Sequence, residues 1–524
     1  MKEFFVKNKR NWIDLLVLFC SLVFISICYL IFKPIYRIEG VADGFASRIF
    51  IYTAIFGWII ALIVLFSRKK LTLNRFLFLL FILAILLRVA YMLITPFDYR
   101  QHDTTGPVGH EAYAGTIYYT GGLPVTNEYQ FYHPPFNAFM QSTWMHIFKP
   151  FLMFANFFIV DPYKFDVNNL DVLYESTQIL SCFYMVIVVY LVIRIFKSIN
   201  LSKPAKLFGI CFIIFFPRLI QFAAQENNDP LCVLFCFFTI FFTFRYAKNK
   251  SWFNTLAIGV SVGLAMMAKL SGAVIALVPG AYFIYDFVKA IKSRKDESTK
   301  VNGKPLWCNL LLKYVSLVIV AFALGLWFSI YAKVRFNQPF GYVLPLSKDS
   351  ELYHGDVNFF ARLINIFDFA DFYKVIYGNT FVNYNLFNFT VRSALFGEFG
   401  FLNADYLAVF AQTINYLFVI LSIVNFIILL CSKEKKKSFL ISFAIILIAT
   451  QYLAQIYFNA TYPFGCTMDF RYIVPIVFGF GLMQALSLDA FYGKKNWKSS
   501  FTLITTILGS TVIASTVIFY LIVI

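Results

Sequence analysis

The sequence predicts an all-α polytopic membrane protein with about thirteen transmembrane helices and two large outer loops. Two observations lead to this fold class. Of the 524 residues, 60% are hydrophobic and 14% are charged, and apolar runs recur from one end of the chain to the other. Each run has about 20 residues, the length that a helix needs to cross a bilayer. Helices are expected because backbone polar groups inside lipid must satisfy one another.

The expected spans follow these runs in order. The first has a basic flank like that of a signal peptide, but it is long and lacks an A-x-A cleavage site, so we interpret it as a retained helix. The seventh and eighth are separated only by a tight turn around Lys269 and Gly272. The thirteen spans are residues 12–32, 48–66, 75–95, 176–196, 204–222, 230–246, 252–268, 271–290, 312–332, 406–431, 438–458, 472–491 and 500–524.

The charge distribution orients the chain. With the N-terminus in the cytoplasm, 29 of the 45 Lys and Arg residues fall on the inner side, whereas 20 of the 27 acidic residues and all five histidines fall on the outer side. Basic residues accumulate in the cytoplasmic connections of membrane proteins. The basic excess therefore reflects topology. Nucleic acid is excluded as a partner because no basic patch is interleaved with exposed aromatic residues.

The chain divides into membrane segments and two outer loops that are too long to be simple connectors. In the first loop, residues 136–158 are apolar and aromatic, but a span there would break the alternation of charge. We expect an interfacial helix on the outer leaflet instead. The expected units are residues 1–95 with three spans, an outer loop at 96–175, spans four to nine at 176–332, a second outer loop at 333–405, and the last four spans at 406–524.

The polar stretch from residue 98 to 135 is the leading candidate for chemistry, because such a cluster adds no stability to a chain this apolar. Asp103 follows the third span by about eight residues, so it lies just above the expected membrane surface, beside His102. A partly desolvated carboxylate in that position is suited to be a general base. The alternative is a solvated loop residue. His110 and Glu111 follow, and Glu111 offers a second carboxylate.

Histidines and tyrosines accompany these carboxylates. The spacing of His102, His110 and His133 matches no compact metal-ligand motif, so neither a metal nor another cofactor is expected. Two prolines follow Tyr132 and His133; they restrict both residues and favour a helix from residue 136. A simple helix start accounts for the prolines but not for the tyrosine and histidine. With Tyr113, these residues are candidates for substrate binding.

Basic residues are rare on the outer side, so each is informative. Arg88 lies near the outer end of the third span, Arg218 in FFPRL, Lys269 in AKLSG and Arg471 in DFRY. A charge in or beside the membrane is costly and indicates function, unless it snorkels or joins a buried ion pair. We expect at least two of these residues to meet around an anionic headgroup. The run at 226–229 either supports this pocket or caps the next helix.

Six segments of the chain are similar, in sequence and in their order, to segments of one known superfamily. They are HDTTGPVGHEAYAGTIYYTGGLP, FYHPPFNAFM, FPRLIQFAAQENNDPL, AKLSG, LFGEFGF and DFRYIVP. Together they cover most of the chain, and the D…GH..Y…LP…YHPP series after the third span is the more specific part. The series resembles the GT-C superfamily of membrane glycosyltransferases. The branch that looks closest contains bacterial and archaeal relatives of protein O-mannosyltransferases and of the lipid A aminoarabinose transferase.

The resemblance implies a GT-C-like fold and an inverting transferase in a bacterial cell membrane. Such an enzyme moves a hexose or pentose from a polyprenyl-phosphate donor to a glycan, lipid or protein acceptor on the outer face. It also implies an essential carboxylate in the first outer loop, which Asp103 matches best. Glu111 is the rival, because many relatives have Asp-Glu near the position of His110 and Glu111. Glu398, within LFGEFGF, joins the expected substrate site. A lipid-monophosphate donor needs no metal.

Two other functions stay open. A polymerase or ligase of polyprenyl-linked glycans would also work on the outer face with a lipid phosphate donor. A transporter of lipids or sugars would place ionisable residues near mid-membrane in several spans and would contain paired, broken hydrophobic segments. Most acidic residues here lie in outer loops instead.

Overall fold

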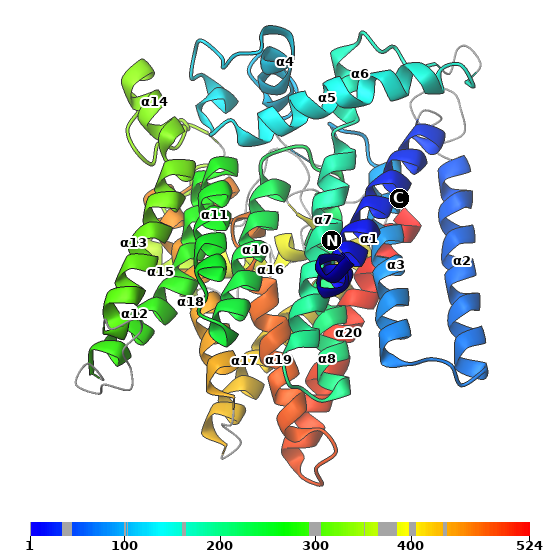
Figure 1. Ribbon diagram of the computed structural model, residues 1–524, viewed down its shortest axis with the longest axis vertical. Coiled ribbons are helices and arrows are strands. Elements are labelled where there is room, and N and C mark those ends of the chain that lie inside the picture. Colours follow the sequence, from blue (N-terminus) through cyan, green and yellow to red (C-terminus); the bar gives the residue numbers. More distant parts are fainter. Residues whose placement is uncertain are drawn as a thin grey trace.

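The computed structural model is all-helical, which confirms the predicted fold class (Figure 1). The structure describes residues 2–33, 45–98, 101, 103–159, 164–292, 305–350, 352–364, 385–397, 405–432 and 437–523. No β-strand occurs in these ranges, although Tyr353 and Phe464 form an isolated antiparallel bridge. Of the residues singled out in the sequence, His102 and Glu398 lie outside the described ranges.

The helices of the first half are α1 (Lys2–Phe32), α2 (Phe45–Ser67), α3 (Leu73–Ile94), α4 (His110–Thr120), α5 (Phe136–Ala155), α6 (Leu170–Glu175), α7 (Gln178–Ser198), α8 (Lys203–Ile214), α9 (Pro217–Gln221) and α10 (Asp229–Lys248). Those of the second half are α11 (Trp252–Ala268), α12 (Leu277–Lys292), α13 (Leu306–Gly325), α14 (Trp327–Phe336), α15 (Phe359–Ile364), α16 (Leu386–Phe396), α17 (Asp405–Cys431), α18 (Ser438–Thr461), α19 (Ile476–Phe491) and α20 (Trp497–Val523). Short 3-10 helices include η2 (Tyr129–Tyr132), η3 (Phe222–Ala224), η4 (Leu270–Ala276), η6 (Gly465–Met468) and η7 (Phe470–Tyr472).

Ten helices of the described chain are long and apolar enough to cross a membrane. The number is eleven if the bent pair formed by Lys203–Ile214 and Pro217–Ala224 is one span. Two shorter apolar helices, α11 and α19, coincide with two further expected spans. The expected count of thirteen is therefore not confirmed, although apolar helices lie at the expected places along the chain.

Two expected spans differ from the helices in the structure. The run at 204–222 bends by 50° between α8 and α9. Pro217 explains the break, because proline lacks an amide donor and disfavours helical geometry in the residue before it. The run expected at 312–332 begins earlier, as α13 at Leu306, and ends at Gly325. The remaining residues form the separate helix α14.

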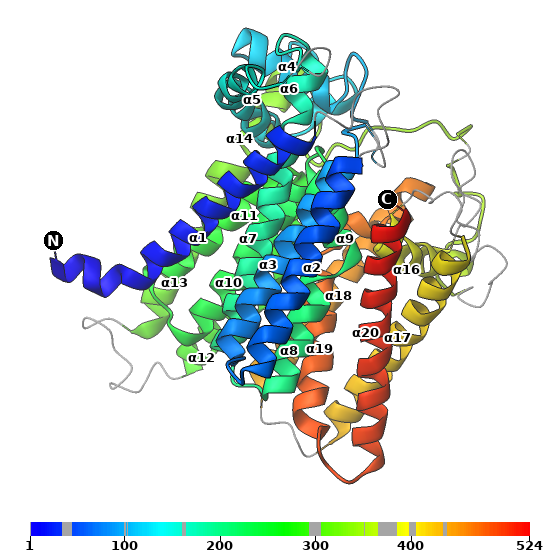
Figure 2. The same ribbon diagram turned by 90° about the vertical axis from the view of Figure 1, so that its right-hand side faces the viewer.

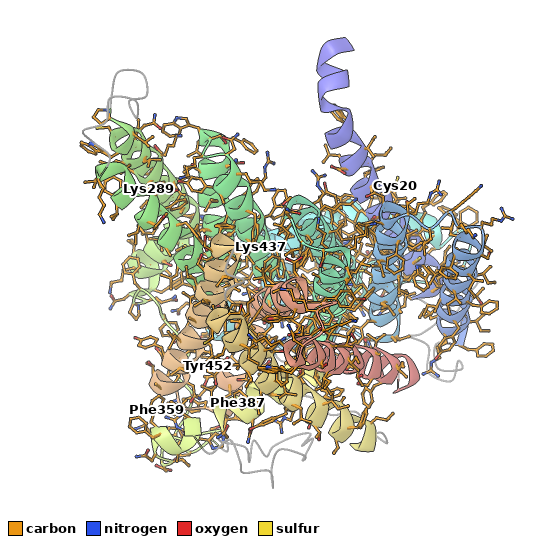
Figure 3. The ribbon with its side chains drawn as sticks, turned by 90° about the horizontal axis from the view of Figure 1, so that it is seen from below. Cys20, Lys289, Phe359, Phe387, Lys437 and Tyr452 are labelled. Carbon is orange, nitrogen blue, oxygen red and sulfur yellow. The ribbon has the colours of Figure 1, made fainter. Side chains whose placement is uncertain are left out.

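The long helices run side by side, and a layer built from α4, α5 and α6 lies across one end of them (Figure 1). Figure 2 shows the same layer above the bundle, with α2 and α3 side by side on the face toward the viewer. The expected interfacial helix is α5, within this layer. Seen from the opposite end, Figure 3 labels Lys289 and Lys437, two of the basic residues that the charge distribution assigns to the inner side. Helix α5 covers most of the expected interfacial segment, residues 136–158.

Close glycine contacts fix the helix that leads into Lys269. A Cβ atom on Gly259 would lie 2.8 Å from the Leu317 carbonyl oxygen, and one on Gly263 would lie 2.8 Å from Leu324 Cβ, so α11 and α13 meet backbone to backbone. After α11 ends, η4 folds back against it. A Cβ on Gly272 would lie 2.7 Å from the Ala265 carbonyl oxygen, so this turn requires glycine. The turn holds Lys269 at the end of α11.

We predict that Gly263→Ala destabilises the protein, although alanine favours helices. Its methyl group would lie 2.8 Å from Leu324 Cβ, and overpacking of this kind costs about 1–3 kcal/mol. The control is Gly280→Ala in α12, where no atom lies within 4 Å of the added methyl and helix propensity improves by about 1 kcal/mol. Thermal unfolding in detergent compares the two. A Gly263→Ala protein as stable as the control would contradict the close approach of α11 and α13.

Candidate active site

A cavity of about 590 Å³ lies where the first outer loop meets the ends of α10, α11 and α18. Six of the residues singled out in the sequence line it, although they come from four separate parts of the chain: Asp103, His110, Tyr132, His133, Lys269 and Arg471. The lining also includes Tyr129, Asn227, Asn228, Asp229, Gln338, Tyr342, Gln451, Gln455, Tyr462 and Tyr472. The cavity therefore combines one carboxylate wall, one cationic wall and many aromatic and amide groups.

The loop before α4 holds Asp103 against the start of that helix. The first amides of a helix have no partner within the helix. Here His110 N–H donates to the Asp103 carbonyl oxygen (2.9 Å) and Glu111 N–H donates to that of Thr104 (3.0 Å). Asp103 adopts φ +64°, a left-handed conformation that is uncommon for residues other than glycine. The loop thus keeps Asp103 in an unusual backbone conformation at the cavity.

Asp103 accepts a hydrogen bond from another residue of the cavity. The Tyr129 hydroxyl donates to its Oδ1 atom. Tyr129 begins η2 and also has a left-handed backbone, with φ +43°. Non-glycine residues in this region store local strain and occur often at functional sites. Asp103 is therefore fixed by its backbone on one side and by a phenol on the other.

The buried His110, the half-buried His133 and Tyr132 form the wall beside Asp103. The rings of His110 and His133 stack with centroids 6.0 Å apart, and the Tyr132 ring lies 4.0 Å from that of His133. Burial lowers the pKa of His110 to about 4, and nearby Asp103 only partly opposes this effect. Burial also lowers the pKa of His133 well below its ordinary value. Both rings are therefore neutral near pH 7.

Tyr113 supports this wall from behind and does not line the cavity. Its ring is buried against Phe131, with centroids 5.3 Å apart. Its hydroxyl donates to the His133 carbonyl oxygen at 3.1 Å. Tyr113 therefore orients the chain at His133, rather than offering its ring to a substrate in this structure.

The cationic wall is formed by Lys269 and Arg471. Lys269 Nζ lies 2.5 Å from Asp229 Oδ1, and Asp229 is the first residue of α10. The same ammonium lies 4.6 Å from the centre of the Tyr472 ring, and the Arg471 guanidinium lies 5.2 Å from it. A cation near the face of an aromatic ring is attracted to it. The Tyr472 ring thus lies close to both cations, and all three residues line the cavity.

Arg218 and Arg88 lie outside the cavity lining. Arg218 is buried and donates to Asp469 Oδ2 at 3.0 Å and to Gln221 Oε1 at 2.7 Å. Asp469 Oδ2 also lies 3.9 Å from Arg471 Nε, so Arg218 acts on the cavity only through a shared carboxylate. Arg88 is fully buried and donates to the carbonyl oxygens of Ala84 and Ile214, which ties α3 to α8. Both arginines bind protein groups in this structure, and neither faces the cavity.

Glu111 faces away from the cavity, toward α6. Successive residues of a helix point in different directions, so His110 reaches the cavity while Glu111 meets Asp171. Burial, a hydrogen bond to Asp171 and the nearby charges of Asp171 and Asp98 raise the pKa of Glu111 to about 8. Glu111 is therefore mostly protonated at neutral pH, and unlike Asp103 it does not line the cavity.

Several lining residues have no clear signal of their own in the sequence. Asp229 stands out there only as part of the polar run at 226–229, and its pairing with Lys269 across 40 positions leaves no local pattern. Asn227 Oδ1 accepts from Asp229 N–H at 3.0 Å, so the run both caps α10 and lines the cavity. In the described part of the chain, no three His, Cys, Asp or Glu side chains are grouped to hold a metal ion.

Part of the second outer loop also contributes to the cavity. Gln338 Nε2 donates to the Tyr132 carbonyl oxygen at 3.4 Å, and Asn127 Nδ2 donates to Gln338 Oε1 at 3.3 Å. Farther along, Gly465 N–H donates to the Leu352 carbonyl oxygen at 2.7 Å. The second loop is thus attached to the first loop and to the chain after α18. No apolar run or motif marks these attachments in the sequence.

A comparison with protein families gives one match, which overlaps part of the cavity lining. Residues 171–297 match the family model described as dolichyl-phosphate-mannose-protein mannosyltransferase. The match is to a GT-C-type family of membrane glycosyltransferases. It confirms the resemblance found in the sequence motifs, and with the many apolar helices it supports an integral membrane glycosyltransferase. Asp229 and Lys269 lie inside the matched stretch, and Asp103 lies before it. No curated protein sequence matches the chain.

We predict that Glu111 makes the folded protein less stable as the pH rises. In the unfolded chain Glu111 ionises near its ordinary pKa of 4.5, but in the folded protein its pKa is about 8. A group with a raised folded pKa stabilises below the unfolded value, and that contribution is lost as the pH rises through the folded value. Melting temperatures of Glu111→Gln should therefore fall less between pH 5 and 8.5 than those of the wild type. Parallel curves for the two proteins would contradict the buried contact with Asp171.

Proposed function

We propose that the protein is an inverting glycosyltransferase that moves one sugar from a polyprenyl-phosphate donor to an acceptor hydroxyl on the outer face of a bacterial cell membrane. One observation carries the proposal: Asp103, Lys269 and Arg471 line the same cavity. A carboxylate beside paired cations is what the transfer requires, because a proton must leave the acceptor while negative charge develops on the departing phosphate. The family match supports a polyprenyl-phosphate sugar as the donor.

The base in this proposal is Asp103. Its carboxylate takes the proton of the acceptor hydroxyl while the hydroxyl oxygen forms a bond to the anomeric carbon of the sugar. The bond from that carbon to the phosphate oxygen breaks, and the phosphate leaves with the electron pair. A single displacement of this kind inverts the anomeric configuration. General base catalysis typically contributes about 10²–10⁴-fold to the rate.

The phosphate site in this proposal is Lys269 with Arg471. Both cations are already held by protein groups, Lys269 by Asp229 and Arg471 through Asp469 and the Tyr472 ring. Cations that are fixed before the reaction stabilise developing charge without reorganising during it. The neutral histidines His110 and His133 add no competing positive charge. A donor phosphate beside Lys269 would therefore have its charge stabilised on the leaving side.

The size of the cavity and its aromatic lining suit a sugar. Ligand sites of about 300–1,000 Å³ are common, and this one is about 590 Å³. Tyr132 and Tyr342 meet edge to face with ring centroids 5.4 Å apart, and both line the cavity. Their rings, with the amides of Asn227, Asn228 and Gln455, can contact the apolar faces and the hydroxyl groups of a hexose or pentose. The acceptor is a glycan, a lipid or a protein.

We predict that Asp103→Asn lowers transfer by about 10²–10⁴-fold, because the amide cannot accept the acceptor's proton. Purified protein in nanodiscs would be tested with radiolabelled polyprenyl-phosphate sugars and a panel of glycan, lipid and peptide acceptors. Donor binding should persist. Asp166→Asn is the control, since Asp166 is an exposed carboxylate of the same outer loop. Normal turnover by Asp103→Asn together with loss of turnover in Glu111→Gln would assign the base to Glu111 instead.

We predict that Lys269→Ala weakens use of the lipid-phosphate donor about tenfold or more. A hydrogen bond to a charged group contributes about 1.5–3 kcal/mol, and about 1.4 kcal/mol corresponds to a factor of ten. Lys149→Ala is the control, because Lys149 of α5 lies outside the cavity lining and its ammonium donates to Asn168 Oδ1 at 3.4 Å. Donor titrations at fixed acceptor concentration measure the effect. Wild-type donor kinetics in both Lys269→Ala and Arg471→Ala would remove the phosphate site from the proposal.

A further inference from the structure

We propose that Tyr129 is the positioning residue for the base: its hydroxyl holds one oxygen of Asp103 and leaves the other directed at the acceptor hydroxyl. This inference rests on the proposed function, because it assumes that Asp103 takes the acceptor's proton. The contact itself is independent of that assumption. The Tyr129 hydroxyl donates to Asp103 Oδ1, and both residues line the cavity.

The neighbour of Tyr129 anchors the turn that carries its hydroxyl. Gln130 is 5% exposed, so its side chain is buried, while the Tyr129 hydroxyl reaches Asp103. The backbone adds support, since Gln130 N–H donates to the Val108 carbonyl oxygen at 3.1 Å. The loop that carries Asp103 and the turn that carries Tyr129 are therefore joined by one side-chain and one backbone hydrogen bond.

The phenol remains a neutral donor at any working pH. Burial raises the pKa of Tyr129 above its ordinary value, and the hydrogen bond to Asp103 and the charge of that carboxylate raise it further. Tyr129 therefore keeps its proton and cannot itself act as the base. Its role toward Asp103 is limited to donating a hydrogen bond.

A carboxylate needs such a donor in order to present one oxygen in one direction. The terminal torsion of an aspartate side chain is broad, so an unsupported carboxylate samples many orientations. A base that is oriented by a third group is a recurrent arrangement in active sites. With Oδ1 held by Tyr129, Oδ2 is the oxygen available to the acceptor. The left-handed backbones of Asp103 and Tyr129 bring the two side chains together.

Tyr129→Phe tests the proposal, because it removes only the hydroxyl. We expect kcat to fall about 10–100-fold, since a small misplacement of a reacting group has an effect of this size. KM for donor and acceptor should stay within twofold, because the phenyl ring still fills its place in the wall. A residue with a merely structural role would not separate kcat from KM in this way. Tyr119→Phe is the matched control, since Tyr119 is 64% exposed on α4 and lies outside the cavity.

A second variant keeps the test decisive if Tyr129→Phe is unstable. Tyr129→Leu also removes the hydroxyl that donates to Asp103 and should lower kcat in the same direction. A normal kcat in both variants, while Asp103→Asn is inactive, would overturn the positioning role and leave the proposed base intact. If Asp103→Asn is itself active, the proposed base fails first, whatever Tyr129 does.

One further readout separates positioning from a blocking role. If Tyr129 merely excluded water from Asp103 until an acceptor arrived, Tyr129→Phe would hydrolyse the donor faster in the absence of acceptor and transfer at the normal rate. That result would overturn the proposal. Radiolabelled donor incubated without acceptor measures this hydrolysis directly. We expect hydrolysis by Tyr129→Phe to be no faster than that of the wild type.

Discussion

Charge persists around the cavity because each of the three cations Lys269, Arg471 and Arg218 has a carboxylate beside it. An unpaired charge removed from water costs several kcal/mol, and only close pairing offsets that cost. Lys269 pairs with Asp229, while Arg218 and Arg471 share Asp469. These pairs connect the start of α10, the end of α11, the break between α8 and α9, and the turns before α19. The ion pairs that offset the cost of removing these charges from water therefore also hold the walls of the cavity in place.

The pairs also explain which features could be read from the sequence. Apolar runs report spans directly, so nearly every long helix was expected close to its place. Asp103 and His110 are near each other in sequence, and a short loop brings both to the cavity. Lys269 and Arg471 could be suspected because outer basic residues are rare. The ion pair of Arg471 with the nearby Asp469 could be suspected too. The partner of Lys269 could not, since Asp229 lies 40 residues away and looks locally like a helix cap. The sequence also groups Arg218 with the cavity cations. Only the fold reveals that Arg218 is buried in an ion pair with Asp469, outside the cavity lining.

Two adjacent residues of helix α4 face different parts of the protein. His110 and Glu111 are adjacent, but the helix directs them to different neighbours. His110 joins the wall of the cavity, whereas Glu111 is packed against α6, where Gly115 also lies so close that a Cβ would be 2.8 Å from Leu170 Cδ2. The sequence placed both residues in one polar stretch and could not separate them, because the position of α6 depends on long-range packing. The carboxylate with the more accessible environment, Asp103, lies in the loop rather than on the helix.

The uncharged histidines have a consequence for the conditions in which the site works. An active site on the outer face, as proposed, meets the acidity of the medium, which the cell does not buffer. An ordinary histidine would become charged as the medium acidifies from neutral to about pH 5. His110, with a pKa of about 4, and His133, whose pKa is also lowered, stay neutral over that range. The positive charge near Lys269 and Arg471 therefore does not increase through these histidines when the pH of the medium falls.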